Sequence, residues 1–191
     1  MAAPERPLRA DARRNRDRLV AEATAAFAAA DDTVPLEDIA RRAGVGIGTL
    51  YRHFPTREAL VEAVYATELD EITRSAAALL EQLPPDAALR AWMNRYARFV
   101  ELKRGLVDTL RAGWASGRIA TSTTRERVTS AIATILTAGA ASGVFRADTE
   151  PDDVTALLLG VFLSTGPDRD RAQVARLLDL VLDSLRPSAR P

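Results

Sequence analysis

The 191-residue sequence predicts an all-α protein of about nine helices, and three observations support this fold class. Apolar residues recur with a helical period along almost the whole chain. No segment alternates apolar and polar residues as a half-buried strand would. Hydrophobic residues make up 47% of the chain, which is enough for a packed core. We therefore expect a head of three short helices followed by a body of about six longer ones.

The three helices of the head are expected at residues 13–30, 36–43 and 46–54. Leu19 and Phe27 fall on one apolar face of the first helix. Pro35 precedes the second helix, where a missing N–H costs little, and Gly44 ends it because glycine readily adopts a positive φ. Pro55 ends the third helix, since the residue before a proline avoids the α region.

The body is expected to begin with a long helix over residues 57–82, which Thr56 can cap and the Pro84–Pro85 pair terminates. Five further helices are expected at residues 86–102, 106–116, 123–142, 151–164 and 170–185. The boundary between head and body should fall inside the long helix and not at a flexible linker. A rigid shared helix of this kind can transmit movement from one part to the other.

Composition argues against several classes of protein. The chain contains no cysteine and a single histidine, His53, so a zinc site would need carboxylates for its other ligands. No phosphate-binding loop, nucleotide-binding glycine pattern or nucleophile–base set is recognisable. We therefore expect no metal, no cofactor and no enzymatic activity.

The N-terminus is rich in arginine although the net charge of the chain is zero. Six arginines and three acidic residues lie within residues 1–18. Such an arm suits contact with phosphates, but a solvated disordered tail fits equally well. The segment lacks the apolar stretch of a secretory signal, and no apolar run reaches membrane-spanning length. We therefore expect a cytoplasmic protein that makes no contact with a membrane.

Residues 36–60 are the most informative part of the sequence. Two short predicted helices flank a glycine turn, which is the pattern of a helix-turn-helix. Ile39 and Ala40 on the first helix are expected to face Leu50 and Phe54 on the second. The exposed face of the second helix would carry hydrogen-bonding side chains suited to phosphates and base edges. Taken alone, the pattern also fits a helical hairpin with an ordinary polar surface.

The segment at residues 43–60, AGVGIGTLYRHFPTREAL, resembles the DNA-binding signature of the TetR family of repressors. The close resemblance covers about residues 13–65, and beyond it only the all-helical layout and the length match. It implies that Tyr51 lays its ring on the DNA backbone and donates its hydroxyl to a phosphate. It also implies that Thr49 and His53 contact phosphates, and that Arg52 reaches a phosphate or a base. Gly48 would let the helix backbone come close to a base edge.

The sequence departs from the family pattern at two positions and varies it at a third. Gly46 and Ile47 stand where the family often has Ser and then Lys. Gly46 tolerates an N-cap position but lacks a side-chain acceptor, and Ile47 offers an apolar contact to a thymine methyl. Arg57 stands where the family usually has a phosphate-binding Lys. The candidate DNA-binding residues are Arg14, Gly46, Ile47, Gly48, Thr49, Tyr51, Arg52, His53 and Arg57.

The last two predicted helices are the most apolar of the chain. Either they pack only within the monomer, or, as the resemblance implies, they pair with the same helices of a second subunit as a four-helix bundle. A two-fold dimer would then require a pseudo-palindromic operator. The candidate dimer residues are Leu157, Val161, Val174, Leu177, Leu178, Val181 and Leu185.

Aromatic residues of the body are candidates for an effector pocket. Trp92, Tyr96 and Phe99 recur at helical spacing and share one face, which suits either a packed core or an apolar cavity for a small hydrophobic effector. The candidate pocket residues are Trp92, Tyr96, Phe99, Leu110, Trp114 and Phe162. Three arginines could anchor an acidic ligand or simply be solvated, namely Arg95, Arg98 and Arg111.

Together these features predict a ligand-responsive regulator of transcription, a homodimeric repressor that binds double-stranded DNA and is released by a small-molecule effector. The alternative is a helical small-molecule-binding protein without affinity for DNA. The expected organisation is a disordered basic arm at residues 1–12, a DNA-binding domain at 13–60, an effector-binding and dimerisation domain at 61–186, and a disordered tail at 187–191.

Overall fold

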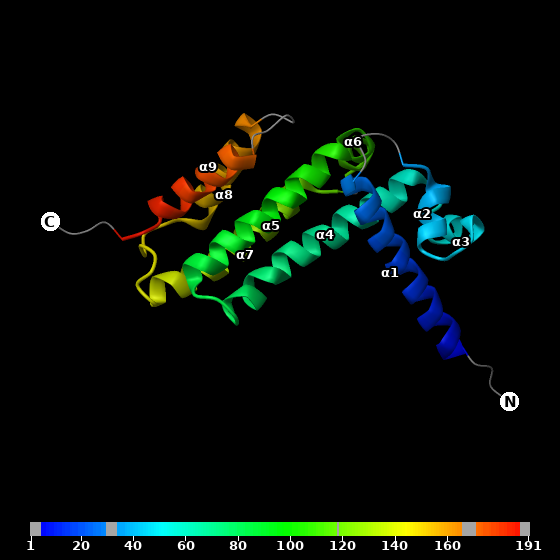
Figure 1. Ribbon diagram of the computed structural model, residues 1–191, viewed down its shortest axis with the longest axis horizontal. Coiled ribbons are helices and arrows are strands. Elements are labelled where there is room, and N and C mark those ends of the chain that lie inside the picture. Colours follow the sequence, from blue (N-terminus) through cyan, green and yellow to red (C-terminus); the bar gives the residue numbers. More distant parts are fainter. Residues whose placement is uncertain (1–4, 30–33, 118, 166–170, 188–191) are drawn as a thin grey trace. The chain divides into compact units, whose positions relative to one another are not determined.

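The computed structural model describes residues 5–29, 34–117, 119–165 and 171–187, and these residues form nine helices and no strand (Figure 1). The all-α fold class and the expected number of helices are confirmed. In chain order the helices are α1 (Glu5–Ala29), α2 (Leu36–Arg42), α3 (Ile47–His53), α4 (Arg57–Leu80), α5 (Pro85–Gly105), α6 (Val107–Ala115), α7 (Thr121–Ala141), α8 (Pro151–Ser164) and α9 (Arg171–Ser184).

Helix α1 begins earlier than the sequence led us to expect. It starts at Glu5 and not near residue 13, so most of the arm expected to be disordered at residues 1–12 is helical. Pro7 lies in the first turn, where a backbone N–H would have no acceptor within the helix. Arg14 bonds Asp11, and Arg18 bonds Asn15, each one turn along the helix. Helix-forming residues and these local pairs therefore extend the helix towards the N-terminus. Residues 1–4 of the arm lie outside the described residues.

The chain forms two compact units, which we describe separately. The first unit contains residues 1–68 and 101–119, and the second contains residues 69–100 and 120–191. The division passes through α4 and again through α5, so both helices contribute to both units. The domain boundary expected from the sequence lay at residue 60. The division observed here is different, because α6 belongs to the same unit as the N-terminal residues. Of the tail expected to be disordered at residues 187–191, only Pro187 is among the described residues.

The core of the first unit is formed by apolar faces of α1, α2, α3 and the start of α4. Leu19 of α1, Ile39 of α2 and Leu50 of α3 are fully buried, and these three helices contact one another. Burial of each such side chain stabilises the fold by roughly 1.5–3 kcal/mol. Thr56 caps α4, since its Oγ1 accepts a hydrogen bond of 3.2 Å from the Ala59 N–H. This confirms the capping role predicted for Thr56.

The second unit is held by the packing of α8 against α7 and α9. One contact in it depends on a glycine: Phe145 packs directly on Gly139 of α7. A Cβ added at Gly139 would lie only 2.0 Å from the ring carbon Cδ2 of Phe145. The absence of a side chain at this position therefore lets the segment after α7 fold back onto that helix.

Candidate nucleic-acid interface

The turn between α2 and α3 has the geometry that a helix-turn-helix requires. Gly44 adopts a φ of +68°, which L side chains rarely adopt. The Val45 N–H donates to the Ala40 carbonyl at 3.0 Å and the Gly44 N–H donates to the Arg41 carbonyl at 3.1 Å, so the chain reverses directly after α2. Helix α3 then begins after Gly46, whose carbonyl accepts a 2.9 Å hydrogen bond from the Thr49 N–H. α2 and α3 lie side by side as a result (Figure 1).

Helix α3 has one buried face and one exposed face. Leu50 and the following residue Phe54 are buried in the core of the first unit. Ile47 is 37% exposed and Tyr51 is 46% exposed, although both are large apolar or aromatic side chains. Arg52 is also exposed. An aromatic ring with a hydroxyl, next to a guanidinium on a rigid helix, is suited to binding phosphates and base edges.

The other predicted residues of α3 frame this exposed face. Gly46 and Gly48 are exposed, and a Cβ added at either would meet no atom within 4 Å. Thr49 and His53 are half-buried at the margin of the face. Arg14, on α1, is exposed and bonded to Asp11. The structure therefore brings the α3 residues together on one surface and leaves Arg14 on a separate helix.

Arg57 has a structural role that the sequence did not reveal. Its Nη1 donates a 2.6 Å hydrogen bond to the Val34 carbonyl, and its guanidinium lies 5.3 Å from the ring centroid of Phe27. It thus links the start of α4 to α1 and to the segment before α2. A flat guanidinium can donate at its edge while its face lies on a ring, which an ammonium cannot do. The Arg in place of the usual Lys is the only sequence signal for this role.

A second arginine–aromatic contact supports the end of α3. The guanidinium of Arg16, on α1, lies 5.1 Å from the ring centroid of Phe54. The ring of His53 lies 6.3 Å from the Phe54 ring and is tilted by 50° to it. Phe54 is therefore enclosed by α1 on one side and by the last residue of α3 on the other, which fixes the orientation of the exposed face.

The predicted dimer residues fall into two groups in the second unit. Leu178, Val181 and Leu185 are buried in the core of their own unit. Val174 is half-buried. The remaining three line a shallow apolar groove of about 660 Å³ on α8 and α9, in which Leu157 is 50% exposed. The groove is lined by Asp153, Ala156, Leu157, Gly160, Val161, Ser164 and Leu177.

The predicted pocket residues are divided between the two units. Trp92, Tyr96, Phe99 and Phe162 are buried in the second unit, whereas Leu110 and Trp114 belong to the first. The Trp92 indole stacks on Tyr96 at 5.4 Å and donates a 3.0 Å hydrogen bond to the Ile72 carbonyl. Phe162 meets Tyr96 edge-on at 5.5 Å. These four aromatic residues therefore pack as a core cluster.

The remaining candidate groups give no sign of chemistry in the described residues. Arg95, Arg98 and Arg111 are exposed, and Arg111 pairs with Asp108. Within the described ranges no three metal-ligating side chains lie close enough to hold an ion. None of the described helices is both long enough and apolar enough to cross a membrane.

Two family profiles match the chain. Residues 19–64 match the family described as bacterial regulatory proteins, tetR family, and residues 84–187 match the SbtR-like transcriptional regulator C-terminal domain. The first match contains α2, α3 and the exposed face described above. The second covers more than half of the chain. No curated protein sequence is significantly similar to the chain.

Solved structures of similar proteins cover most of the chain. A TetR transcriptional regulator from Streptomyces coelicolor is 46% identical, with a TM-score of 0.81 and coverage of 91% of this chain and 99% of that one. A TetR transcription regulatory protein from Mycobacterium vanbaalenii is 35% identical, with a TM-score of 0.73 and coverage of 95% and 100%. The TetR family regulator PfmR from Thermus thermophilus is 26% identical, with a TM-score of 0.56 and coverage of 87% and 98%.

Both family matches and these structures agree with the geometry of the helix-turn-helix. The matched families contain transcriptional regulators, which are not enzymes. The resemblance first seen in residues 43–60 therefore extends over most of the chain. The chain belongs to the TetR family of transcriptional regulators.

Proposed function

We propose that the chain is a cytoplasmic, ligand-responsive repressor that binds a pseudo-palindromic operator as a homodimer and leaves it when a small, mainly hydrophobic effector binds. The observation that carries this proposal is the exposed face of α3. A half-exposed tyrosine beside an exposed arginine, on a helix fixed by Leu50 and Phe54, has no evident role in folding. It fits the major groove of a DNA duplex.

On this proposal the residues of the face divide by task. Tyr51, Thr49 and His53 hold the sugar–phosphate backbone and set the register, since phosphate contacts position a protein without reading sequence. Gly48 and Ile47 lie where base edges would come closest, with Ile47 suited to a thymine methyl. Arg52 reaches a base or a phosphate. Arg14 and Arg57 add phosphate contacts from α1 and from the start of α4.

The apolar groove on α8 and α9 supports the proposed homodimer. Leu157 and Val161 of α8 and Leu177 of α9 expose apolar surface beside one another. A second copy placed across a two-fold axis would cover this surface with the same residues. Such a dimer would present two copies of α3 to one DNA duplex, which is why we expect an inverted repeat.

Release by an effector requires that the ligand bind the conformer with low DNA affinity more tightly than the other. Helix α4 begins just after the residues of the DNA-binding face and continues as one helix into the second unit. We propose that effector binding shifts α4 and thereby changes the separation of the two α3 helices in the dimer.

The test is selection of bound duplexes from a random pool by the full-length protein. We expect an inverted repeat whose half-sites lie one or more helical turns apart, at about 34–36 Å per turn. Binding should weaken steeply with rising salt, because phosphate contacts release counterions. A chain with both Tyr51→Ala and Arg52→Ala is the control and should select nothing.

Failure to bind any duplex at low ionic strength would contradict the proposal. If such a protein still bound small molecules, the alternative of a ligand-binding protein without DNA affinity would replace it. Selection of a single, unrepeated half-site would retain DNA binding and contradict the symmetric dimer.

A further inference from the structure

The first unit contains a cation that is partly buried and has no carboxylate partner. Lys103, the only lysine of the chain, lies in the last turn of α5 and is half-buried. Its ammonium lies 5.3 Å from the ring centroid of Trp114 on α6. Burial lowers the pKa of Lys103 from its usual value. Among the described residues no Asp or Glu forms an ion pair with it.

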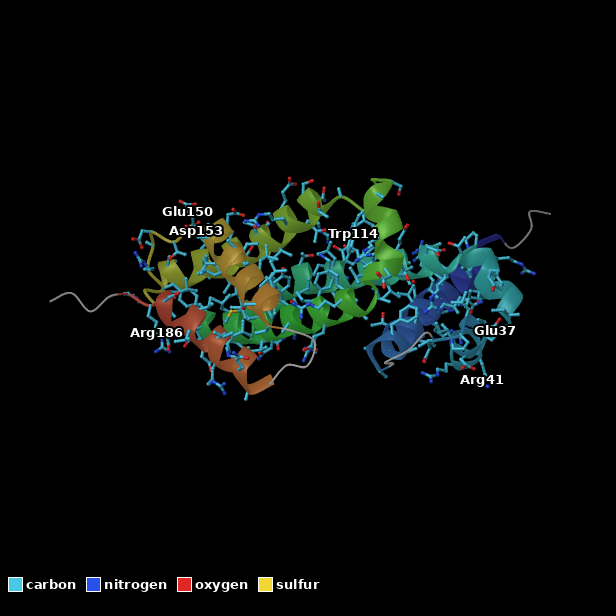
Figure 2. The ribbon with its side chains drawn as sticks, turned by 90° about the horizontal axis from the view of Figure 1, so that it is seen from above. Glu37, Arg41, Trp114, Glu150, Asp153 and Arg186 are labelled. Carbon is cyan, nitrogen blue, oxygen red and sulfur yellow. The ribbon has the colours of Figure 1, made fainter. Side chains whose placement is uncertain are left out.

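Trp114, whose ring lies beside this ammonium, carries an unsatisfied donor of its own (labelled in Figure 2). Its Nε1 is buried, yet it has no hydrogen-bond partner in the described part of the chain. The other tryptophan shows the usual outcome, because the Nε1 of Trp92 donates to the Ile72 carbonyl. A buried indole N–H without an acceptor is unusual and calls for an occupant that supplies one.

Both donors belong to one short stretch of chain, which also contributes buried apolar side chains. The Lys103 carbonyl accepts a hydrogen bond from the Leu106 N–H at 3.3 Å, which joins α5 directly to α6. Leu106 and Leu110 are buried on α6, and Leu110 lies one turn before Trp114. The site thus combines a desolvated positive charge, a second donor and apolar side chains.

We propose that Lys103 and Trp114 form the polar anchor of the effector site and bind a carboxylate carried by an apolar molecule. A carboxylate supplies acceptors for both donors and cancels the single positive charge, which makes both hydrogen bonds charge-assisted. A neutral acceptor would satisfy the indole but would add no negative charge beside the half-buried ammonium. The exposed arginines Arg95, Arg98 and Arg111 do not require a negatively charged ligand, since water already solvates them. The inference rests on the proposed function in taking the ligand to be the effector.

The test is calorimetric titration of the full-length protein with matched pairs of small molecules. The probes are straight-chain carboxylates from butanoate to dodecanoate and arylacetates such as phenylacetate, each paired with its primary amide. We expect at least one carboxylate to bind about tenfold or more tightly than its amide, since a hydrogen bond to a charged group exceeds one to a neutral group by roughly this factor. If no carboxylate binds, or if an amide binds equally well throughout, the inference is overturned.

Two variants and a control locate the anchor. Lys103→Met should abolish the preference for the carboxylate, and Trp114→Phe should weaken carboxylate binding several-fold. Arg111→Gln is the matched control, because Arg111 is an exposed cation on α6, and it should keep the preference. A preference that survives Lys103→Met would overturn the inference.

Thermal unfolding separates an anchor from a structural cation. Lys103→Met should melt at the same temperature or higher, because the variant no longer buries an uncompensated charge. A variant that melts several degrees lower would make Lys103 a structural residue and contradict the inference. Binding of duplex DNA by the unliganded variants reports separately on the proposed function. A native chain that binds DNA but shows no preference for carboxylates over amides would overturn only the anchor. A native chain that prefers carboxylates but binds no DNA would overturn only the proposed regulatory function.

Discussion

At the scale of single residues, Tyr51 separates DNA binding from folding most cleanly. Its ring is half-exposed on α3, and its hydroxyl makes no hydrogen bond within the described residues. Removing that hydroxyl should therefore leave the fold unchanged. We therefore expect Tyr51 to act by binding a partner molecule, which on the proposed function is DNA.

We predict that Tyr51→Phe weakens operator binding by about tenfold for each subunit, and so by about a hundredfold for the proposed dimer, because a hydrogen bond to a charged phosphate is worth roughly 1.5 kcal/mol or more. Fluorescence anisotropy with the selected operator measures the change. Tyr65→Phe makes the same chemical change at a buried position of the first unit and should leave the Kd for DNA unaltered. Equal affinity of Tyr51→Phe and the native chain would remove the proposed phosphate contact.

Arg57 shows how one side chain serves both folding and binding. We predict that Arg57→Lys lowers the free energy of unfolding by about 1 kcal/mol, since a single ammonium is less suited than a guanidinium to bonding the Val34 carbonyl and contacting the Phe27 ring at the same time. The salt dependence of DNA binding should stay unchanged, because the positive charge remains. Arg57→Met should lose the same stability and also reduce the slope of log K against log salt by about 1.8, because each subunit of the proposed dimer loses one phosphate contact.

Denaturant unfolding and binding at several salt concentrations measure these two effects. A Lys variant as stable as the native chain would deny the structural role of Arg57. If Arg57→Met left the salt dependence of DNA binding unaltered, the proposed contact of Arg57 with a phosphate would be contradicted. The sequence predicted the second role and missed the first, because both contacts of Arg57 are with residues at least twenty positions away in the chain.

At the scale of helices, local signals predicted most of the boundaries. Gly44, Pro55 and Thr56 mark ends and starts that the structure reproduces to within a residue or two. The start of α1 was missed because six arginines looked like a solvated arm, while their intrinsic helix propensity and pairing with Asp11 and Asn15 extend the helix. For predicting where a helix begins, charge density is thus a poorer guide than helix propensity when no glycine or interior proline interrupts the segment.

Gly139 is an element-scale feature that periodicity does not reveal. We predict that Gly139→Ala destabilises the protein by about 1–3 kcal/mol, because the new methyl would collide with Phe145 and force a shift in α7 or in the chain after it. Denaturant unfolding measures the loss. Gly105→Ala, where an added methyl meets no atom within 4 Å, is the control and should not destabilise.

Without the Phe145 contact, alanine would be the better residue inside a helix, so a stabilised Gly139→Ala protein would refute this packing. The sequence could not reveal the requirement, because it depends on a ring that returns to α7 from beyond its end. Such contacts between segments are what helical periodicity leaves undetermined.

At the scale of the whole molecule, packing decided which apolar residues are available to a partner. The spacing of Trp92, Tyr96 and Phe99 correctly placed them on one face, but it could not show that Phe162 packs against them. In the same way Leu178, Val181 and Leu185 are used by the core of their own unit. Only Leu157, Val161 and Leu177 line the groove.

We predict that Leu157→Asp dissociates the dimer and weakens operator binding by at least about tenfold, because a charge in the covered groove would be buried without a partner. Light scattering after size exclusion at micromolar protein, together with operator titration, measures both effects. Leu83→Asp introduces the same charge at an exposed leucine outside the groove and should leave the dimer intact. A native chain that elutes as a monomer would contradict the dimer altogether.

The composition of the first unit also has a consequence for recombination within this family. Because that unit consists of residues 1–68 and 101–119, no single crossover in the gene can transfer it without also transferring residues 69–100 of the second unit. A chimera that takes only the first 68 residues from a relative would combine the helix-turn-helix of that relative with the α6 and the end of α5 of the recipient chain. Exchange of operator preference between relatives should therefore succeed more often by replacing the few exposed residues of α3 than by grafting the N-terminal segment.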